Sequence, residues 1–244
     1  MRYAVLGDIH SNQSALEAVL ADIDTQKVDQ ILSVGDVVGY GASPSECIAI
    51  LRGANAVVVK GNHDAACVGE LNEDTFNRFA REAVRWTRDV ISKGDMEWLR
   101  SLPLAITLEH CQVAHGSVHD PHRFEYIRTT RDADPSLDLM TRPVAFVGHT
   151  HMPIALMRLL EPAGATAYSP VLDVDLRESD RCLVNVGSVG QPRDEDHRTG
   201  WVLFDSEAQT VRLRRLGYEI EVAAKRIHDA GLPRMLADRL YLGV

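Results

Sequence analysis

Five short motifs carry side chains that commonly bind metal ions, and they follow one another along the chain. They are Gly7-Asp8-Ile9-His10, Gly35-Asp36, Gly61-Asn62-His63-Asp64, His115-Gly116 and Gly148-His149-Thr150-His151. The potential ligands among them are the two carboxylates of Asp8 and Asp36, five imidazoles and one carboxamide. This set suits a pair of divalent metal ions, and paired ions in a protein cleft typically act on phosphoryl groups.

Most of these motifs directly follow a short apolar run that predicts a β-strand. Such runs occupy residues 2–6, 31–34, 56–59, 112–114 and 144–147. Functional groups gather beyond the carboxyl ends of strands in open α/β sheets, so neighbouring strands would point these side chains into one cleft. A single motif of this kind is more simply explained as a turn with a surface histidine. Five such motifs after five predicted strands are not explained in this way.

The other predicted elements give the arrangement of the chain. Helices are expected over residues 12–23, 43–51, 73–91 and 95–102, with Ser43 as an N-cap and Pro44 in the first turn. Further strands are expected over residues 104–108, 154–159, 182–186, 201–204 and 211–215, and a helical tail over 219–240 is broken at Gly231-Leu232-Pro233. The early β-α-β-α-β order predicts a parallel α/β sheet.

Consecutive strands replace this alternation near residue 104, which suggests two packed sheets in one domain spanning residues 1–244. Residues 117–142 are polar and contain Pro121, Pro135 and several arginines, so we expect a long loop or small cap over the site.

Composition is that of a globular protein of 244 residues, with 45% hydrophobic and 25% charged residues. The net charge of −9 argues against bulk binding to nucleic acid or to an anionic membrane, although bound cations can reverse the field locally. We find no signal peptide and no run of about 20 apolar residues. The separated cysteines, Cys47, Cys67, Cys111 and Cys182, are expected to be buried free thiols of a cytoplasmic protein.

Taken together, the motifs resemble the calcineurin-like metallophosphoesterase superfamily, whose pattern is D-x-H, G-D, G-N-H-[DE], H and G-H-x-H in that order. The resemblance runs from Gly7 to about Asp194 and is strongest to a compact bacterial and archaeal, phosphodiesterase-like branch that continues with N-x-G-S-V-G-Q-P-R, here Asn185 to Arg193. It implies an α/β fold, a four-layer αββα sandwich of two packed mixed β-sheets flanked by helices, with a two-metal centre.

The resemblance also assigns the metal ligands. Asp8, His10 and His151 would hold one ion, Asn62, His115 and His149 the other, and Asp36 would bridge them. His63 would lie beside the pair as a catalytic residue.

This site would carry a surplus of positive charge, because only two of its seven ligands, Asp8 and Asp36, are carboxylates. Two divalent ions about 3.5–4 Å apart can clamp a phosphoryl group and generate a bridging hydroxide that attacks it. The mixture of imidazole and oxygen ligands suits Mn²⁺, Fe, Zn²⁺, Co²⁺ or Ni²⁺ better than Ca²⁺.

His63 is the candidate for protonating the leaving oxygen. The alternative is that His63 only positions its loop. Protein Ser/Thr phosphatases of the superfamily continue the second motif as G-D-x-x-D-R-G, whereas here Gly39 and Tyr40 replace the Asp-Arg pair. Protein phosphatase activity is therefore not expected, and His63 would have Asp64 or no charged partner.

Three residues are candidates for substrate binding: Arg193, Tyr40 and Arg123. The guanidinium of Arg193 could hold phosphate oxygens, or pair with Asp194 or Glu195 instead. Tyr40 could stack on the substrate or belong to the core edge. Arg123, like His119 and His122, could line the pocket or be a solvated loop residue.

The leading hypothesis is a metal-dependent phosphoesterase acting on small phosphodiesters or phosphomonoesters, with a preference for diesters. The alternative is a nucleotide or dinucleoside polyphosphate hydrolase. A non-catalytic, protein-binding scaffold is a third hypothesis, but such proteins lose ligands that this chain retains. The expected partner is a small phosphorylated substrate, and the sequence does not define an oligomeric state.

Overall fold

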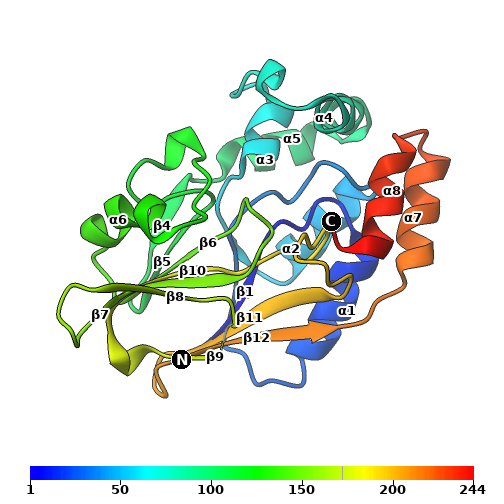
Figure 1. The fold of residues 1–244 in the computed structure, drawn as a ribbon. Helices are drawn as coiled ribbons and strands as arrows, with labels where there is room; N and C mark the ends of the chain where they lie inside the picture. Colours follow the sequence, from blue (N-terminus) through cyan, green and yellow to red (C-terminus); the bar gives the residue numbers. More distant parts are fainter. Residues whose placement is uncertain (172) are drawn as a thin grey trace.

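In a computed structural model, which describes residues 1–171 and 173–244, two six-stranded sheets pack face to face between helices (Figure 1). One sheet has the order β3 (Val57–Val58), β2 (Gln30–Ser33), β1 (Arg2–Leu6), β11 (Thr199–Asp205), β12 (Thr210–Leu216), β9 (Asp173–Asp175). The other has the order β4 (Ala105–Thr107), β5 (Cys111–Ala114), β6 (Val144–Val147), β10 (Ser179–Asn185), β7 (Ile154–Leu159), β8 (Thr166–Ser169). The predicted four-layer αββα fold is confirmed.

Each sheet contains a parallel half, and these halves position the site. β1, β2 and β3 run parallel in the first sheet, and β5, β6 and β10 run parallel in the second. The remaining strands pair antiparallel. The carboxyl ends of each parallel set therefore lie along one edge of its sheet.

Side-chain alternation along the strands builds separate cores on the two faces of each sheet. In β1, Tyr3 and Val5 pack between the sheets, whereas Ala4 and Leu6 pack under the outer helices. In β6, Val144 and Phe146 face the inter-sheet core, and the residues between and after them face the opposite layer.

The helices form the two outer layers. They are α1 (Gln13–Ile23), α2 (Pro44–Gly53), α3 (Asn62–Cys67), α4 (Arg78–Val90), α5 (Lys93–Ser101), α6 (Thr130–Leu139), α7 (Ile220–Asp229) and α8 (Arg234–Leu242), with 3₁₀ turns at Glu73–Thr75, Pro121–Arg123 and Leu176–Glu178. α7 and α8 lie side by side next to α1 (Figure 1). In the described part of the chain, no helix is long and apolar enough to cross a membrane.

The predicted helix over residues 73–91 is wrong at its start. Asn77 accepts a hydrogen bond from the Ala80 amide at 3.0 Å, which begins α4 at Arg78. Phe76, before it, has an extended backbone and turns its ring toward His63.

Segment 117–142 is less irregular than expected, because it contains α6. Thr129 and Asp132 form a capping box that starts this helix despite the internal Pro135. α6 covers the outer face of the second sheet.

Three further details of the structure can be compared with the sequence-based expectation. The edge strands β8 and β9, not predicted, are short, and the exposure of β8 alternates. Ser43 stands at the N-cap of α2, but its side chain makes no capping hydrogen bond. The four cysteines are free and buried, as predicted.

Candidate metal centre

The seven predicted ligands and His63 lie together at the carboxyl edge of both parallel strand sets, and all eight are buried. Asp8 and His10 follow β1, and Asp36 follows β2. Asn62 and His63 begin α3, just after β3, whereas His115 follows β5 and His149 and His151 follow β6. The first sheet therefore contributes five of these residues and the second sheet three.

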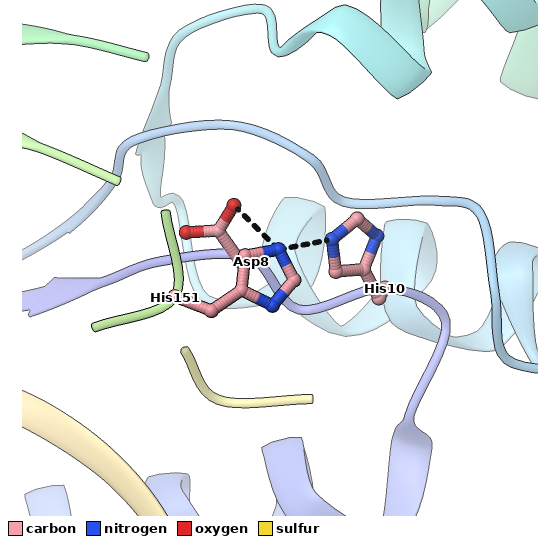
Figure 2. Close-up of side chains that lie close together, drawn as sticks. All are labelled: Asp8, His10 and His151. Atoms are coloured by element: carbon pink, nitrogen blue, oxygen red, sulfur yellow. Dashed lines mark hydrogen bonds and ion pairs between the residues drawn. The ribbon is translucent and has the colours of Figure 1, made fainter. Parts of the chain in front are cut away.

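Asp8, His10 and His151 form the first group (Figure 2). The Nε2 atom of His151 lies 3.5 Å from Asp8 Oδ1 and 3.1 Å from His10 Nε2. Asp8 itself is fully buried.

Backbone carbonyls fix the tautomers of the two histidines in this group. His10 Nδ1 lies 3.0 Å from the Val38 carbonyl oxygen, and His151 Nδ1 lies 2.6 Å from that of Gln191. Because a carbonyl only accepts, both Nδ1 atoms donate, and both neutral rings present a bare Nε2 lone pair.

Two lone pairs that face each other at 3.1 Å repel unless a cation lies between them. Two imidazole nitrogens bound to one metal ion at about 2.0–2.1 Å would be separated by roughly 3 Å. The arrangement therefore fits a metal ion, and the carbonyl partners orient the ligands.

Asn62, His115 and His149 form the second group. His115 Nδ1 donates to the Val34 carbonyl oxygen at 2.8 Å, so its Nε2 faces inward. This Nε2 lies 2.9 Å from Asn62 Oδ1 and 3.1 Å from His149 Nδ1. With His115 in its neutral form, atoms that accept hydrogen bonds converge here too.

Asp36 lies between the two groups. Its Oδ2 atom is 3.6 Å from His10 Nε2 and 3.4 Å from His115 Nε2. Its Oδ1 atom accepts the His63 amide at 2.8 Å, which anchors the carboxylate to the start of α3. One carboxylate thus contacts a ligand of each group.

Burial and neighbouring charges shift the pKa values of the cluster residues in opposite directions. Burial lowers the pKa values of His10, His149 and His151 well below the usual range, so these rings are neutral ligands. Burial also acts to lower the pKa of His115, but Asp36, Asp8 and the Val34 carbonyl together outweigh it and raise that pKa to about 9. Burial raises the pKa of Asp8. At Asp36 burial acts in the same direction, but interactions with His115, His63 and His10 together outweigh it and lower the pKa of that carboxyl.

Five of the seven predicted ligands have left-handed backbones, with φ between 48° and 69°: Asp8, His10, Asp36, His149 and His151. Residues other than glycine rarely adopt this conformation, and such outliers gather at functional sites. Close packing adds to the constraint, because a Cβ atom on Gly148 would lie 2.4 Å from Asp8 Oδ2.

The run from Asn185 to Arg193 forms hydrogen bonds with the first group of ligands. The Ser188 hydroxyl donates to the Asp8 carbonyl oxygen at 2.7 Å and accepts the Gln191 amide at 2.8 Å. Gln191 in turn accepts from His151. These bonds explain the small and polar residues of this run as a backbone support for the ligands.

His63 packs beside the cluster among aromatic rings. Its ring centroid lies 4.8 Å from that of His10 and 4.5 Å from that of Tyr40. Burial lowers the pKa of His63 to about 4 in the metal-free protein. A ring nitrogen of His63 also lies within 4.8 Å of ligand atoms on His10 and Asp36.

Gly39 explains why His63 has no aspartate partner at that position. A Cβ atom on Gly39 would lie 2.4 Å from His63 Nδ1, and the Gly39 φ angle is +93°. Asp64 does not replace the missing partner, because its two oxygens accept the amides of Val38 and Gly61 at 3.1 and 3.0 Å. Within the described chain, His63 Nδ1 is buried without a hydrogen-bond partner.

Arg193 lies next to the first group without an ion-pair partner among the described residues. Its Nη2 atom donates to Gln191 Oε1 at 2.8 Å, and its Cζ atom lies 5.5 Å from the Tyr40 ring centroid. Asp194, the alternative partner, pairs with Arg215 instead.

Tyr40 has features of both interpretations of the sequence. Its ring contacts His10 and His63, and it also belongs to the apolar cluster formed by α4, α7 and α8. The side chain is buried.

Arg123 is exposed and pairs with Glu125 at 3.3 Å. Two residues of this segment that the sequence analysis missed contact the cluster: Phe124, whose ring lies edge-on to that of His115 with centroids 5.9 Å apart, and Tyr126. The ring of Tyr126 stacks on that of His149, with centroids 3.8 Å apart and planes 19° apart. Nothing in local spacing reveals this contact, because it joins two segments that meet only in the tertiary structure.

Comparisons with known proteins agree with this geometry. The model of the calcineurin-like phosphoesterase superfamily domain matches residues 1–209. An uncharacterized protein of Methanocaldococcus jannaschii is 36% identical over 246 residues, which span 98% of this chain and 97% of that protein.

Two crystal structures share the fold over the whole chain. A metallophosphoesterase from Sphaerobacter thermophilus is 37% identical with a TM-score of 0.87, and the match covers 100% of both chains. A hypothetical protein from Pyrococcus horikoshii OT3 is 20% identical with a TM-score of 0.82, covering 100% of this chain and 98% of that one.

Proposed function

The chain belongs to the calcineurin-like phosphoesterase superfamily, and on that premise we propose that it hydrolyses phosphodiester or phosphomonoester bonds with the help of two divalent metal ions. Metal dependence follows from the family and from the His and Asp clusters. The bond type, the number of ions and the roles of individual residues are parts of the proposal.

The observation that supports two ions is the position of Asp36 between two groups of ligands. Asp8, His10 and His151 would hold one ion, and Asn62, His115 and His149 the other, with Asp36 shared. Bound there, the ions would activate water and neutralise the charge of a phosphoryl group.

The residues around the cluster would bind the phosphate and assist departure of the leaving group. Arg193 offers a guanidinium that no carboxylate of the described chain neutralises, and its fork matches phosphate oxygens. In hydrolysis a water oxygen bonds to phosphorus, the bond from phosphorus to the leaving oxygen breaks, and that oxygen takes a proton.

His63 would supply this proton in the proposed reaction. Its imidazole is neutral near pH 7 in the metal-free protein, because burial lowers its pKa to about 4. An anionic phosphate next to the ring would raise that pKa and favour the protonated donor.

Gly39 and Tyr40 support a small-ester substrate over a phosphoprotein. The Asp-Arg pair typical of the protein phosphatases is missing, and the contact between Gly39 and His63 leaves no room for a side chain. Retention of every predicted ligand in one buried cluster disfavours the scaffold hypothesis.

A metal-by-substrate screen tests the proposal. Protein freed of metal is reconstituted with Mn²⁺, Fe²⁺, Zn²⁺, Co²⁺, Ni²⁺ or Ca²⁺ and assayed with bis(4-nitrophenyl) phosphate and 4-nitrophenyl phosphate. We expect turnover that requires a transition metal and saturates with two ions per chain.

The variant Asp36→Asn should lose turnover and bind fewer than two metal ions per chain. The variant Asp24→Asn, which changes an exposed residue at the end of α1, should keep both turnover and metal content. Tight metal binding without turnover of either ester would favour the scaffold hypothesis instead.

A further inference from the structure

Each group of ligands is bordered by a tyrosine that carries an arginine on its ring. At the first group, Tyr40 packs against His10, and Arg193 Cζ lies 5.5 Å from the Tyr40 centroid. At the second group, Tyr126 stacks on His149, and Arg128 Cζ lies 4.6 Å from the Tyr126 centroid. The centre is thus flanked by two histidine–tyrosine–arginine series, of which the first meets its histidine edge to face and the second is a stack.

The second stack lies at the surface. Tyr126 is 48% exposed, although one of its faces covers a predicted ligand. Arg128 is exposed as well, so solvent and a substrate can reach its guanidinium. Contact with an aromatic ring holds an arginine in place without neutralising its charge.

The acidic groups nearest in sequence to Arg128 are engaged elsewhere. Glu125 pairs with Arg123 and, at 3.0 Å, with His119. Asp132 accepts the backbone amides of Arg128 and Thr129 at 3.1 and 3.0 Å as part of the α6 cap. No carboxylate in the part of the chain that the structure describes forms an ion pair with the Arg128 guanidinium.

The second stack borders the metal centre through Tyr126, because its ring lies on that of the predicted ligand His149. Arg128 lies two stacking contacts away from the ligand His149.

We propose that Arg128, held on Tyr126, binds a second anionic group of the substrate while the scissile phosphate lies at the metal centre. The proposal rests on the proposed phosphoesterase function and narrows its substrate class. The substrate is a phosphoester that carries a further phosphate or carboxylate, as nucleotide bisphosphates and nucleoside oligophosphates do. A neutral alcohol substituent would leave Arg128 without a partner.

Binding measurements test this assignment separately from catalysis. Isothermal calorimetry on the metal-reconstituted protein compares thymidine 5′-monophosphate with thymidine 3′,5′-bisphosphate, which differ only by the second phosphate. We expect the wild type to bind the bisphosphate at least about tenfold more tightly, as one charge-assisted guanidinium–phosphate contact allows. Arg128→Ala should lose this preference and keep its affinity for the monophosphate.

Matched variants exclude indirect effects. Arg131→Ala removes an exposed arginine three residues along, which lies on neither tyrosine ring, and should keep the preference. Arg128→Lys should restore part of the preference for the bisphosphate. Tyr126→Ala should weaken this preference, because the ring no longer holds the guanidinium.

The turnover of thymidine 5′-(4-nitrophenyl phosphate), with and without a 3′-phosphate, gives a second readout. Loss of Arg128 should raise KM for the phosphorylated ester and leave kcat unchanged. Equal affinities in the wild type, or equal losses in the Arg128 and Arg131 variants, would overturn the assignment. A retained bisphosphate preference without any turnover would instead reject the catalytic function and leave the anion site standing.

Discussion

At the scale of single residues, the cluster combines unfavourable local features that a metal ion would compensate. Five predicted ligands adopt left-handed backbones, and bare imidazole nitrogens face one another. Each such backbone costs on the order of 1–3 kcal/mol, so the surrounding structure must impose it. This concentration of strain is evidence for function that is independent of the sequence motifs.

The role of His63 is open to a direct test. His63→Asn should keep the metal content and lower kcat by about 10²–10⁴, since it removes only the proton donor. Metal analysis and steady-state kinetics on the same sample measure both. Intact turnover would exclude the donor role, and joint loss of metal and turnover would make His63 a ligand, as its proximity to His10 and Asp36 allows.

Gly39 should tolerate no side chain. Gly39→Ala places a methyl carbon 2.4 Å from His63 Nδ1, closer than van der Waals contact allows, and forces a non-glycine residue to φ +93°. We expect a loss of more than about 1 kcal/mol in the free energy of unfolding and a larger loss of turnover than of metal. Urea unfolding and kcat measure the two effects. Gly53→Ala, at a glycine whose Cβ would meet nothing within 4 Å, is the matched control.

At the scale of elements, the ends of strands and the starts of helices carry the site, and side chains elsewhere hold these elements in register. Asp22 on α1 is an example. It accepts two hydrogen bonds from Arg214 of β12, at 2.7 and 2.9 Å, and one from Trp201 of β11 at 2.9 Å. These bonds fix α1 to the sheet whose β1 leads to Asp8 and His10.

Asp22 should therefore stabilise the fold in a pH-dependent manner. The hydrogen bonds from Arg214 lower its pKa, so the stabilisation is present above the unfolded-state pKa of about 3.9 and is lost as pH falls through the folded-state value. Asp22→Asn should cost about 1–2 kcal/mol at pH 7, a range reduced for the partial exposure of the pair.

Urea unfolding of wild type and variant between about pH 7 and 3 measures this dependence. The difference between them should shrink toward the acidic end. A difference that stays constant over this range would show that the charge of Asp22 contributes nothing. Asp24→Asn, on the exposed end of the same helix, should have little effect at any pH.

At the scale of the whole molecule, neither sheet holds a complete site. Asp8 and Asp36 come from the first sheet, whereas His115, His149 and His151 come from the second. An ion bound by Asp8 and His151, or by Asp36 and His115, therefore links the two sheets across the inter-sheet core. Metal binding and folding should be coupled, because the unfolded chain has no such site.

Removal of metal should accordingly lower thermal stability. At a free metal concentration of 100 times Kd, binding adds about 2.7 kcal/mol to the free energy of unfolding. For a chain of this size that corresponds to a rise in Tm of roughly 5–10 °C. Scanning calorimetry with excess metal and with chelator measures it.

The Asp36→Asn variant should show a much smaller shift, because it loses the carboxylate that contacts both groups. An unchanged Tm in the wild type, at metal concentrations that saturate binding, would contradict the coupling of the two sheets through metal.

The sequence by itself determined the ligand types, most strands and helices and the two-sheet α/β class. These rest on local signals: apolar periodicity, capping residues and polar motifs directly after strands. The motifs also determined the family, since Asp8, Asp36 and Gly148-His149-Thr150-His151 occur in its order. Two local signals were overlooked, and both are caps: Asn77 begins α4 later than predicted, and the capping box of Thr129 and Asp132 begins α6 despite its internal Pro135.

Only the tertiary structure decided how these residues meet. It placed Asp36 between two groups from different sheets, turned Asp64 away from His63, and brought Tyr126 and Arg128 to the edge of the site. The physical reason is that these contacts join segments far apart in the chain, so no local spacing encodes them. They depend on the packing of two sheets, which aligns the ends of strands that the sequence can only describe one at a time.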